Sequence, residues 1–246
     1  MADLSAIHEQ VLDCTACALS ATRTNAVPGE GPVNARVMFV GEGPGFNEDR
    51  QGRPFIGAAG QFLNELLASI GLRREDVFIT NMVKCRPPNN RDPFPVEIST
   101  CSSYLDAQIE TIAPDVIIPL GRHALSRWFP NETISKLKAK PRRFGSQVVL
   151  PLYHPAAALH NGSLRSVIMD DFQRVRALLD EAYQVPTVHE AEPSEQVSLL
   201  EQTAVAAPAV PASANPRVAA PAKPDESAAT GADRPTSARS PRAMGN

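Results

Sequence analysis

The sequence predicts an α/β fold in which helices cover both faces of a parallel sheet. Short apolar runs alternate along the chain with longer segments whose apolar residues recur at helical spacing, and this alternation is typical of parallel sheets. In addition, a polar residue follows several of the apolar runs, as in sheets that bind ligands at the carboxyl ends of their strands. We therefore expect the functional residues along that edge of the sheet.

Four short apolar segments are predicted to form the strands. They are residues 37–40, 77–83, 115–120 and 147–152, and they are rich in valine and isoleucine. Buried strands of a parallel sheet have this near-continuous apolar character. Three polar residues, Glu42, Asn81 and His154, fall near the carboxyl ends of three different strands. Because the carboxyl ends of parallel strands share one edge, these side chains are expected to converge.

The helices are predicted from apolar stripes and from the residues at their ends. Gly71 is expected to end one helix, Pro95 to occupy the first turn of another, and Ser163 to cap the last. The predicted helices are residues 4–12, 61–70, 95–112, 121–128 and 163–179.

A glycine-rich loop follows the first predicted strand. Gly41, Gly43 and Gly45 permit a tight turn and a close approach of the backbone to another group. Position 46 is phenylalanine where a dinucleotide fingerprint requires glycine, and the Gly-Lys-Ser/Thr ending of a P-loop is missing. The loop is therefore not expected to bind a pyrophosphate. Glu42 either projects toward a ligand here or is an ordinary solvated side chain.

The composition indicates one domain and a tail. Residues 1–184 contain all the periodic segments, whereas residues 185–246 are dominated by Ala, Pro, Ser and Thr. Such a segment buries too little apolar area to offset the entropy of ordering, so the tail is expected to be disordered, with a partner that the sequence does not identify.

The net charge of −3 does not indicate a nucleic-acid binder by itself. Without a secretory signal or a membrane span, we expect a cytoplasmic protein with no membrane partner.

The four cysteines are candidates for metal binding. Cys14 and Cys17 form a Cys-x-x-Cys pair, and Cys85 and Cys101 follow far along the chain. In a reducing compartment this set suits either a Cys₄ zinc site or an iron–sulfur cluster, and spacing does not choose between them. In the alternative interpretation, Cys85 and Cys101 are simply buried thiols.

Together these motifs resemble the iron–sulfur enzymes of family 4 in the uracil-DNA glycosylase superfamily. The resemblance covers roughly residues 8–180, and its motifs are residues 41–45, 48–55, 81–88 and 154–157 together with the four cysteines. It implies a three-layer α/β/α sandwich with a four-stranded parallel sheet. It also implies an enzyme that flips uracil out of DNA and hydrolyses its N-glycosidic bond.

The resemblance assigns roles to individual residues. Phe55 is expected to stack on uracil rather than to be a core residue, and Asn81 to read the pyrimidine edge rather than to cap a turn. His154 is expected to donate to uracil O2, and Glu42 to place the attacking water. The backbone of residues 41–43 would line the pocket, so that Gly41, Glu42 and Gly43 bind substrate. His123 is predicted only as a residue near a helix N-terminus.

The resemblance also concerns the cofactor and the DNA. It favours a [4Fe–4S] cluster of structural role over zinc at the four cysteines.

Leu159 and Arg165 are expected to press into the duplex where the base leaves. A basic run at 136–143 is interpreted as a phosphate-contacting patch or, alternatively, as a solvated loop. Because this run contains no histidine, a covalent link to DNA is not expected. The basic residues proposed as DNA contacts are Lys138, Lys140, Arg142 and Arg143.

The expected partner is uracil-containing DNA, double- or single-stranded, bound by a monomeric chain. Two alternatives belong to other functional classes. One is a DNA-binding module that carries the cluster without catalysis, and the other is an α/β enzyme that binds a small molecule at the glycine loop. The release of free uracil from an oligonucleotide discriminates among the three.

Overall fold

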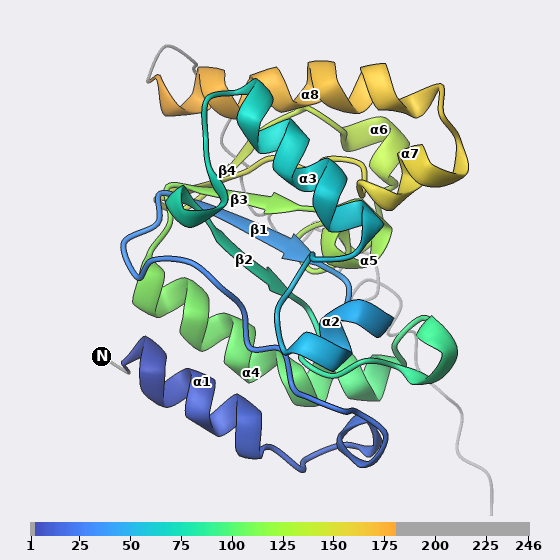
Figure 1. The fold of residues 1–246 in the computed structure, drawn as a ribbon. Coiled ribbons are helices and arrows are strands. Elements are labelled where there is room, and N and C mark those ends of the chain that lie inside the picture. Colours follow the sequence, from blue (N-terminus) through green and yellow to red (C-terminus); the bar gives the residue numbers. More distant parts are fainter. Residues whose placement is uncertain (1–2, 181–246) are drawn as a thin grey trace, which may run out of the picture. The chain divides into compact units, whose positions relative to one another are not determined.

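The computed structural model of the chain describes residues 3–180 (Figure 1). The predicted disordered tail at 185–246 and the predicted domain boundary before it lie outside these residues and stay predictions. Within the described part, no helix is both long enough and apolar enough to cross a membrane.

A five-stranded sheet forms the centre of the fold. Its strands are β1 (Val37–Gly41), β2 (Phe78–Asn81), β3 (Val116–Pro119), β4 (Arg142–Phe144) and β5 (Gln147–Val149), in the order β2-β1-β3-β5-β4. The pairs β1–β2, β1–β3 and β3–β5 are parallel, so the predicted four-stranded parallel sheet is confirmed. From β1 the chain moves to one side to form β2 and then returns past β1 to form β3. The reversal opens a crevice beyond the carboxyl ends of β1 and β3, where such sheets bind ligands.

Helices cover both faces of the sheet, and this confirms the predicted three-layer α/β/α arrangement (Figure 1). Helices α3 (Ala58–Ser69) and α8 (Leu164–Leu179) lie on one face, and α1 (Leu4–Asp13) and α4 (Pro95–Ile112) lie on the other. The shorter elements are α2 (Phe46–Gln51), α5 (Gly121–Leu125), α6 (Ile134–Leu137), α7 (Ala156–His160) and the 3₁₀ turns η1 (Ala18–Ala21), η2 (Arg74–Asp76) and η3 (Pro88–Asn90).

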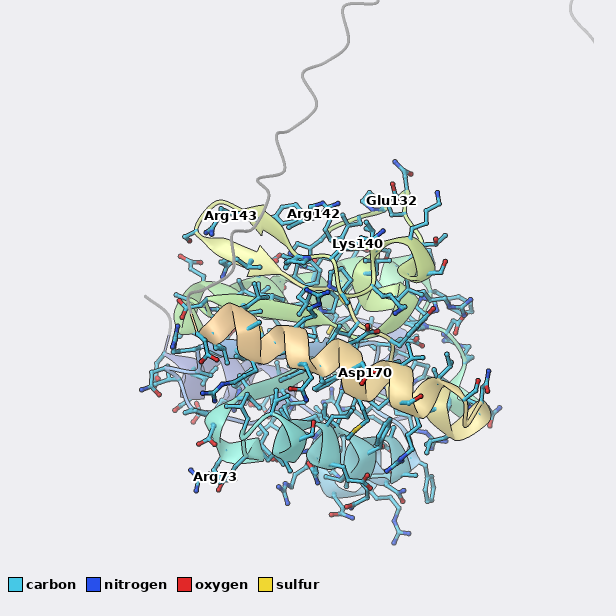
Figure 2. All side chains as sticks on the ribbon, turned by 90° about the horizontal axis from the view of Figure 1, so that it is seen from above. Arg73, Glu132, Lys140, Arg142, Arg143 and Asp170 are labelled. Atoms are coloured by element: carbon cyan, nitrogen blue, oxygen red, sulfur yellow. The ribbon has the colours of Figure 1, made fainter. Side chains whose placement is uncertain are left out.

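The edge strand β4 was not predicted. It pairs antiparallel with β5, from Arg142 opposite Val149 to Phe144 opposite Gln147. Arg142 and Arg143 lie along an outer edge of the molecule (Figure 2). A strand of three residues, two of them arginine, has no apolar pattern from which to predict it. Charged residues are common on edge strands because they discourage pairing with another chain.

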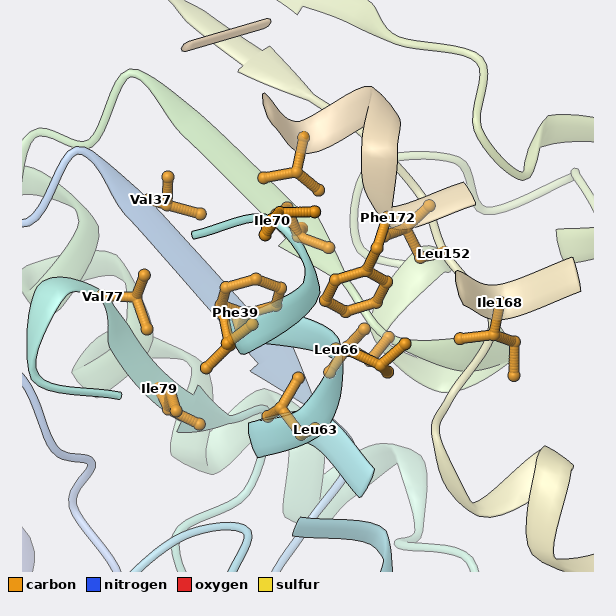
Figure 3. Close-up of a cluster of buried hydrophobic side chains, with 14 of the residues drawn as sticks. Val37, Phe39, Leu63, Leu66, Ile70, Val77, Ile79, Leu152, Ile168 and Phe172 are labelled. Carbon is orange, nitrogen blue, oxygen red and sulfur yellow. The ribbon is translucent and has the colours of Figure 1, made fainter. Parts of the chain in front are cut away.

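The two faces of the sheet contact two separate apolar clusters. Val37 and Phe39 belong to the cluster under α3 and α8, where the ring of Phe39 stacks on that of Phe172 with centroids 5.8 Å apart (Figure 3). Met38 and Val40 belong to the cluster under α1 and α4. This alternation follows from the two-residue repeat of a strand. Burial on both sides fixes the strand register, because a slip by one residue would exchange the two faces.

Several helices differ from their predicted bounds or were missed. Helix α3 begins at Ala58 rather than at residue 61, and α5 ends at Leu125 rather than at residue 128. Helices α2, α6 and α7 were not predicted, because helices of four to six residues are too short to display a 3.6-residue period.

Candidate active site

A cavity of about 600 Å³ lies at the carboxyl edge of the sheet. It is called the strand-end cavity below. Glu42 enters it directly after β1, Asn81 is the last residue of β2, and His154 follows the bridge between Leu120 and Leu152. Phe55 and Gly43 also line it. The structure therefore brings together the groups that the sequence singles out at three strand ends.

Asn81 presents an unpaired acceptor beside this cavity. The side chain is 1% exposed, and its Oδ1 atom has no hydrogen-bond donor among the described residues. Gly41 pairs with Asn81 across β1 and β2. A Cβ atom on Gly41 would lie 2.4 Å from Asn81 Oδ1 and 2.7 Å from the Phe55 ring. Gly41 does not line the cavity itself, but its missing side chain leaves the space that these two groups occupy. A buried acceptor without a donor is uncommon and indicates a ligand.

Phe55 has a strained backbone that several contacts hold in place. Its φ of +50° lies in the left-handed region, which bulky residues rarely adopt. Arg74 donates from Nη1 to the Phe55 carbonyl at 2.9 Å and from Nη2 to the Pro54 carbonyl. Gly60 lies so close that a Cβ atom there would be 1.8 Å from the Phe55 oxygen. These contacts place the Phe55 ring against the imidazole of His154.

Glu48 was part of a sequence motif, but no role was predicted for it. Its Oε1 atom accepts from the backbone N–H groups of Ile56 at 2.9 Å and Gly57 at 2.8 Å. Gly57 caps the N-terminus of α3, where a negative charge is stabilised by the helix dipole. Glu48 therefore fixes the segment that follows Phe55 and also lines the strand-end cavity. The sequence carries no signal for this contact beyond the acidic residue itself.

His154 is held as a neutral imidazole with a defined tautomer. Its Nδ1 atom accepts from the backbone N–H of Ala156 at 3.1 Å. Burial lowers the pKa of His154 to about 4, although the negative charge of Glu48 opposes the shift. At neutral pH the ring therefore carries one proton, and because Nδ1 is an acceptor that proton is on Nε2. His154 can then donate a hydrogen bond from Nε2.

Glu42 lies beside a histidine and a second carboxylate. His123 Nε2 is 3.6 Å from Glu42 Oε2 and 3.3 Å from Asp92 Oδ1. Burial raises the pKa of Glu42, His123 opposes this rise, and the charge of Asp92 adds to it. No role was predicted for His123, because its approach to Glu42 depends on β1 and β3 being neighbours in the sheet. Among the described residues, one group of three His, Cys, Asp or Glu side chains has ligand atoms that all lie within 4.8 Å of one another. This group is Glu42, Asp92 and His123.

The four cysteines come together in a second, smaller cavity. Cys14, Cys17, Cys85 and Cys101 all line it, and it is called the cysteine cavity below. All four thiols are free, and Cys85 and Cys101 are buried. Arg23 Nη1 lies 3.1 Å from Cys85 Sγ. Burial raises the pKa of Cys101 to about 11, so a nearby positive charge or a bound metal is needed to deprotonate it at neutral pH.

Lys84 was not predicted as a functional residue, yet it is only 1% exposed and is one of the residues that line the cysteine cavity. Burial lowers its pKa to about 7.

The predicted DNA-contacting residues lie outside the strand-end cavity. Leu159 is 50% exposed on α7, the helix that also brings Ala156 to the cavity. Arg165 forms an ion pair with Glu65, and Lys138 pairs with Asp171 at 3.0 Å. Lys140, Arg142 and Arg143 lie together along one edge of the molecule (Figure 2).

The fold and the strand-end cavity define an α/β domain of the enzyme type, because acidic, amide and imidazole groups from separate strands meet at the sheet edge where such enzymes bind substrates. Comparison with known proteins identifies the family. The sequence model of the uracil DNA glycosylase superfamily matches residues 28–179, and the chain belongs to this superfamily.

Three similar proteins illustrate the relationship. A type-4 uracil-DNA glycosylase of Sulfurisphaera tokodaii is 50% identical over 72% of this chain and 86% of its own length. One of Archaeoglobus fulgidus is 49% identical over 72% of this chain and 94% of its own length. One of Thermotoga maritima is 48% identical over 70% and 93%, respectively.

Proposed function

We infer that this chain is a uracil-DNA glycosylase that removes uracil from DNA and leaves an abasic site, as the first step of base excision repair. Its type-4 relatives support this reaction. The observation that carries it in the structure is the unpaired Asn81 acceptor, which lies with Phe55 and His154 at one cavity. A base flipped out of the DNA stack brings a planar ring with donors and acceptors along its edge, and these three groups complement such a ring.

Asn81 is proposed to recognise uracil by its hydrogen-bonding edge. The amide oxygen accepts from uracil N3–H, and the amide N–H₂ donates to uracil O4. Cytosine presents an acceptor at N3 and a donor at N4, so both contacts would be mismatched. Each mismatched buried polar group costs about 1–3 kcal/mol, which is enough to exclude cytosine strongly. Phe55 supplies the aromatic face on which the base stacks.

The proposed chemistry separates the base from the sugar with its bonding electrons. The bond between C1′ and uracil N1 breaks, and negative charge develops on the base, including at O2. His154 donates from Nε2 to O2 and stabilises this charge, as an oxyanion-hole donor does. The sugar becomes oxocarbenium-like, water adds at C1′, and Glu42 accepts the proton of that water. The half-buried position of Glu42 raises its pKa and hence its basicity.

The four cysteines are proposed to hold a [4Fe–4S] cluster. The donor set fits, because four thiols converge on the cysteine cavity and no carboxylate or histidine lines it. All four cysteines lie in the described part of the chain, and no three of their sulfur atoms come within 4.8 Å of one another. Sulfur ligands of a single zinc ion lie about 3.8 Å apart, given the Zn–S distance, so this spacing favours the larger cluster. When bound, the cluster would join the N-terminal segment to α4, and no step of the reaction is assigned to it.

Leu159 and the basic edge are proposed to contact DNA. Leu159 is an exposed apolar side chain directly before His160, which lines the strand-end cavity, and such side chains fill the gap left by an extruded base. Lys140, Arg142 and Arg143 would contact phosphates, whereas the charges of Lys138 and Arg165 are already paired with carboxylates. The monomeric state and the partner of the tail stay predictions.

The test is the release of free uracil from a uracil-containing oligonucleotide, with a thymine-containing oligonucleotide as the substrate control. Asn81→Ala and His154→Ala are each expected to lower the rate about 10²-fold or more while leaving the circular dichroism spectrum unchanged. His8→Ala, which alters a histidine outside the strand-end cavity, is the matched control. Wild-type rates in both folded variants would refute the residue assignments. DNA binding by the wild-type chain without uracil release would instead favour the non-catalytic module.

A further inference from the structure

Lys84 lies between the two sites of this protein in sequence and in space. It follows Asn81 by three residues and directly precedes Cys85. Its Nζ atom lies 2.9 Å from the backbone oxygen of Asn81, 2.6 Å from Thr80 Oγ1 and 2.7 Å from Gln108 Oε1. Its backbone N–H donates to Cys101 Sγ at 3.3 Å. One residue therefore contacts both the end of β2 and a thiol of the cysteine cavity.

The partners of Nζ require it to donate three hydrogen bonds. Thr80 Oγ1 has one hydrogen, which faces the Pro28 carbonyl at 3.0 Å and Gln108 Oε1 at 3.2 Å, so toward Lys84 it is an acceptor. Gln108 Nε2 also donates to Pro28 at 2.7 Å, which identifies Oε1 as the acceptor facing Lys84. The Asn81 carbonyl is an acceptor in any state. Three acceptors match the three N–H donors of an ammonium group.

This ammonium group has no carboxylate partner among the described residues. Its three polar contacts are uncharged, and it takes part in none of the ion pairs found there. A fully buried charge without an opposite charge is costly. Lys84 is also one of the residues that line the cysteine cavity, where metal-bound thiolates would supply negative charge.

We propose that Lys84 is a positioning residue that couples the occupied cysteine cavity to the base-reading amide of Asn81. The thiolates hold the ammonium group in its buried place, and the ammonium group in turn fixes the carbonyl at the end of β2. The adjoining backbone is fixed as well, because Val27 N–H donates to the Lys84 carbonyl at 2.8 Å. Loss of the metal cluster would then loosen Asn81 without any change in the residues that touch uracil. This inference rests on the function proposed above.

Two variants separate the charge of Lys84 from its hydrogen bonds. Lys84→Met removes the charge and all three bonds at similar side-chain length. Thr80→Val keeps the charge and removes one acceptor. Arg174→Met, at an exposed basic residue of α8 outside the basic run, is the control. For each folded protein, the ratio of the dissociation constants is measured for DNA that carries thymine and for DNA that carries non-cleavable 2′-fluoro-deoxyuridine. The reduction potential of the cluster is measured on the same preparations.

Lys84→Met is expected to lower the preference for uracil about tenfold, the loss typical of a buried charged hydrogen bond. It is also expected to shift the cluster potential to more negative values, because removing a nearby positive charge disfavours the added electron. Thr80→Val is expected to lower the preference while leaving the reduction potential unchanged, and Arg174→Met to change neither.

Wild-type preference and wild-type potential in Lys84→Met would overturn the proposal. If Lys84→Met does not fold, wild-type preference in Thr80→Val overturns it instead. Failure of the proposed function is a different result: the wild-type chain would then show no preference for uracil and release none. The shift in the reduction potential of the cluster between wild type and Lys84→Met would still report whether the wild-type ammonium group lies near the cluster.

Discussion

The ring of Phe55 lies against the imidazole of His154, with centroids 5.4 Å apart and planes inclined by 29°. One residue is held at a positive φ by Arg74 and Gly60, and the other is oriented by the Ala156 N–H. The proposed stacking face and the proposed hydrogen-bond donor of the site are therefore fixed by separate parts of the chain and meet in a single contact. Neither needs a large movement to receive a base, which is the preorganisation that favours catalysis.

Replacing His154 with Asn is expected to reduce the pH dependence of stability. Burial lowers the pKa of folded His154 to about 4 from an ordinary value of 6.5. Between these values the unfolded state binds the extra proton, so the free energy of unfolding falls as the pH decreases from 6.5 toward 4. The slope attributable to one group is at most about 1.4 kcal/mol per pH unit.

Urea unfolding of wild type and His154→Asn across this range measures the difference in slope. Titration of the remaining groups, including His8, is common to both proteins and cancels in the comparison. Identical slopes would contradict a neutral His154 whose pKa is lowered in the folded protein.

Gly41→Ala is expected to abolish most uracil release while leaving the fold intact. The added Cβ would lie 2.4 Å from Asn81 Oδ1 and 2.7 Å from the Phe55 ring, so both groups must shift. Misplacing catalytic groups by about 1 Å costs on the order of 10²-fold in rate. Gly162→Ala is the matched control, because its Cβ would meet nothing within 4 Å. Equal rates in the two variants would show that the space beside Gly41 is not used.

Leu159→Ala is expected to slow uracil release from double-stranded DNA about tenfold, with a smaller effect on single-stranded DNA. The reason is that unstacking a base step in a duplex costs a few kcal/mol, and an apolar side chain that fills the opened stack offsets this cost. A single strand has no such stack to open. Leu12→Ala alters an equally exposed leucine, 51% against 50%, on the distant helix α1. Equal losses on both substrates would argue against a wedge at Leu159.

Removing charges from the basic edge is expected to reduce the salt dependence of DNA binding. Each of Lys140→Ala, Arg142→Ala and Arg143→Ala should lower the slope of log K against log salt by about one unit if the side chain contacts a phosphate. Lys138→Ala should leave the slope unchanged, because Lys138 is paired with Asp171 at 3.0 Å. Fluorescence anisotropy over a salt series gives the slopes. An unchanged slope in the first three variants would place the DNA elsewhere.

The sequence was sufficient to predict the parallel sheet, its flanking helices and the convergence of three strand ends. These features follow from local patterns, because strand burial and helical periodicity depend on residues that are close together in the sequence. Glu42, Asn81 and His154 were identified since each follows a recognisable apolar run. The short elements α7 and β4 carry too few residues for a period to appear.

The contacts made by Glu48, His123 and Lys84 were beyond prediction from the sequence for another reason. Each depends on which elements become neighbours: Glu48 meets the start of α3, His123 meets Glu42 across β1 and β3, and Lys84 meets Gln108 of α4. A lysine that follows a strand is ordinarily solvated. Lys84 is buried because α4 and the cysteines pack around it.

The pairing of Gly41 with Asn81 across β1 and β2 limits how the length of this chain can change. An inserted residue displaces a strand by about 3.3 Å and turns its following side chain to the opposite face. Insertions within β1 or β2 would therefore separate groups that are proposed to meet one nucleobase. The turn at Gly145 between β4 and β5 has open space around it and can lengthen freely. During evolution, insertions and deletions should therefore be tolerated at that turn and selected against in the two strands.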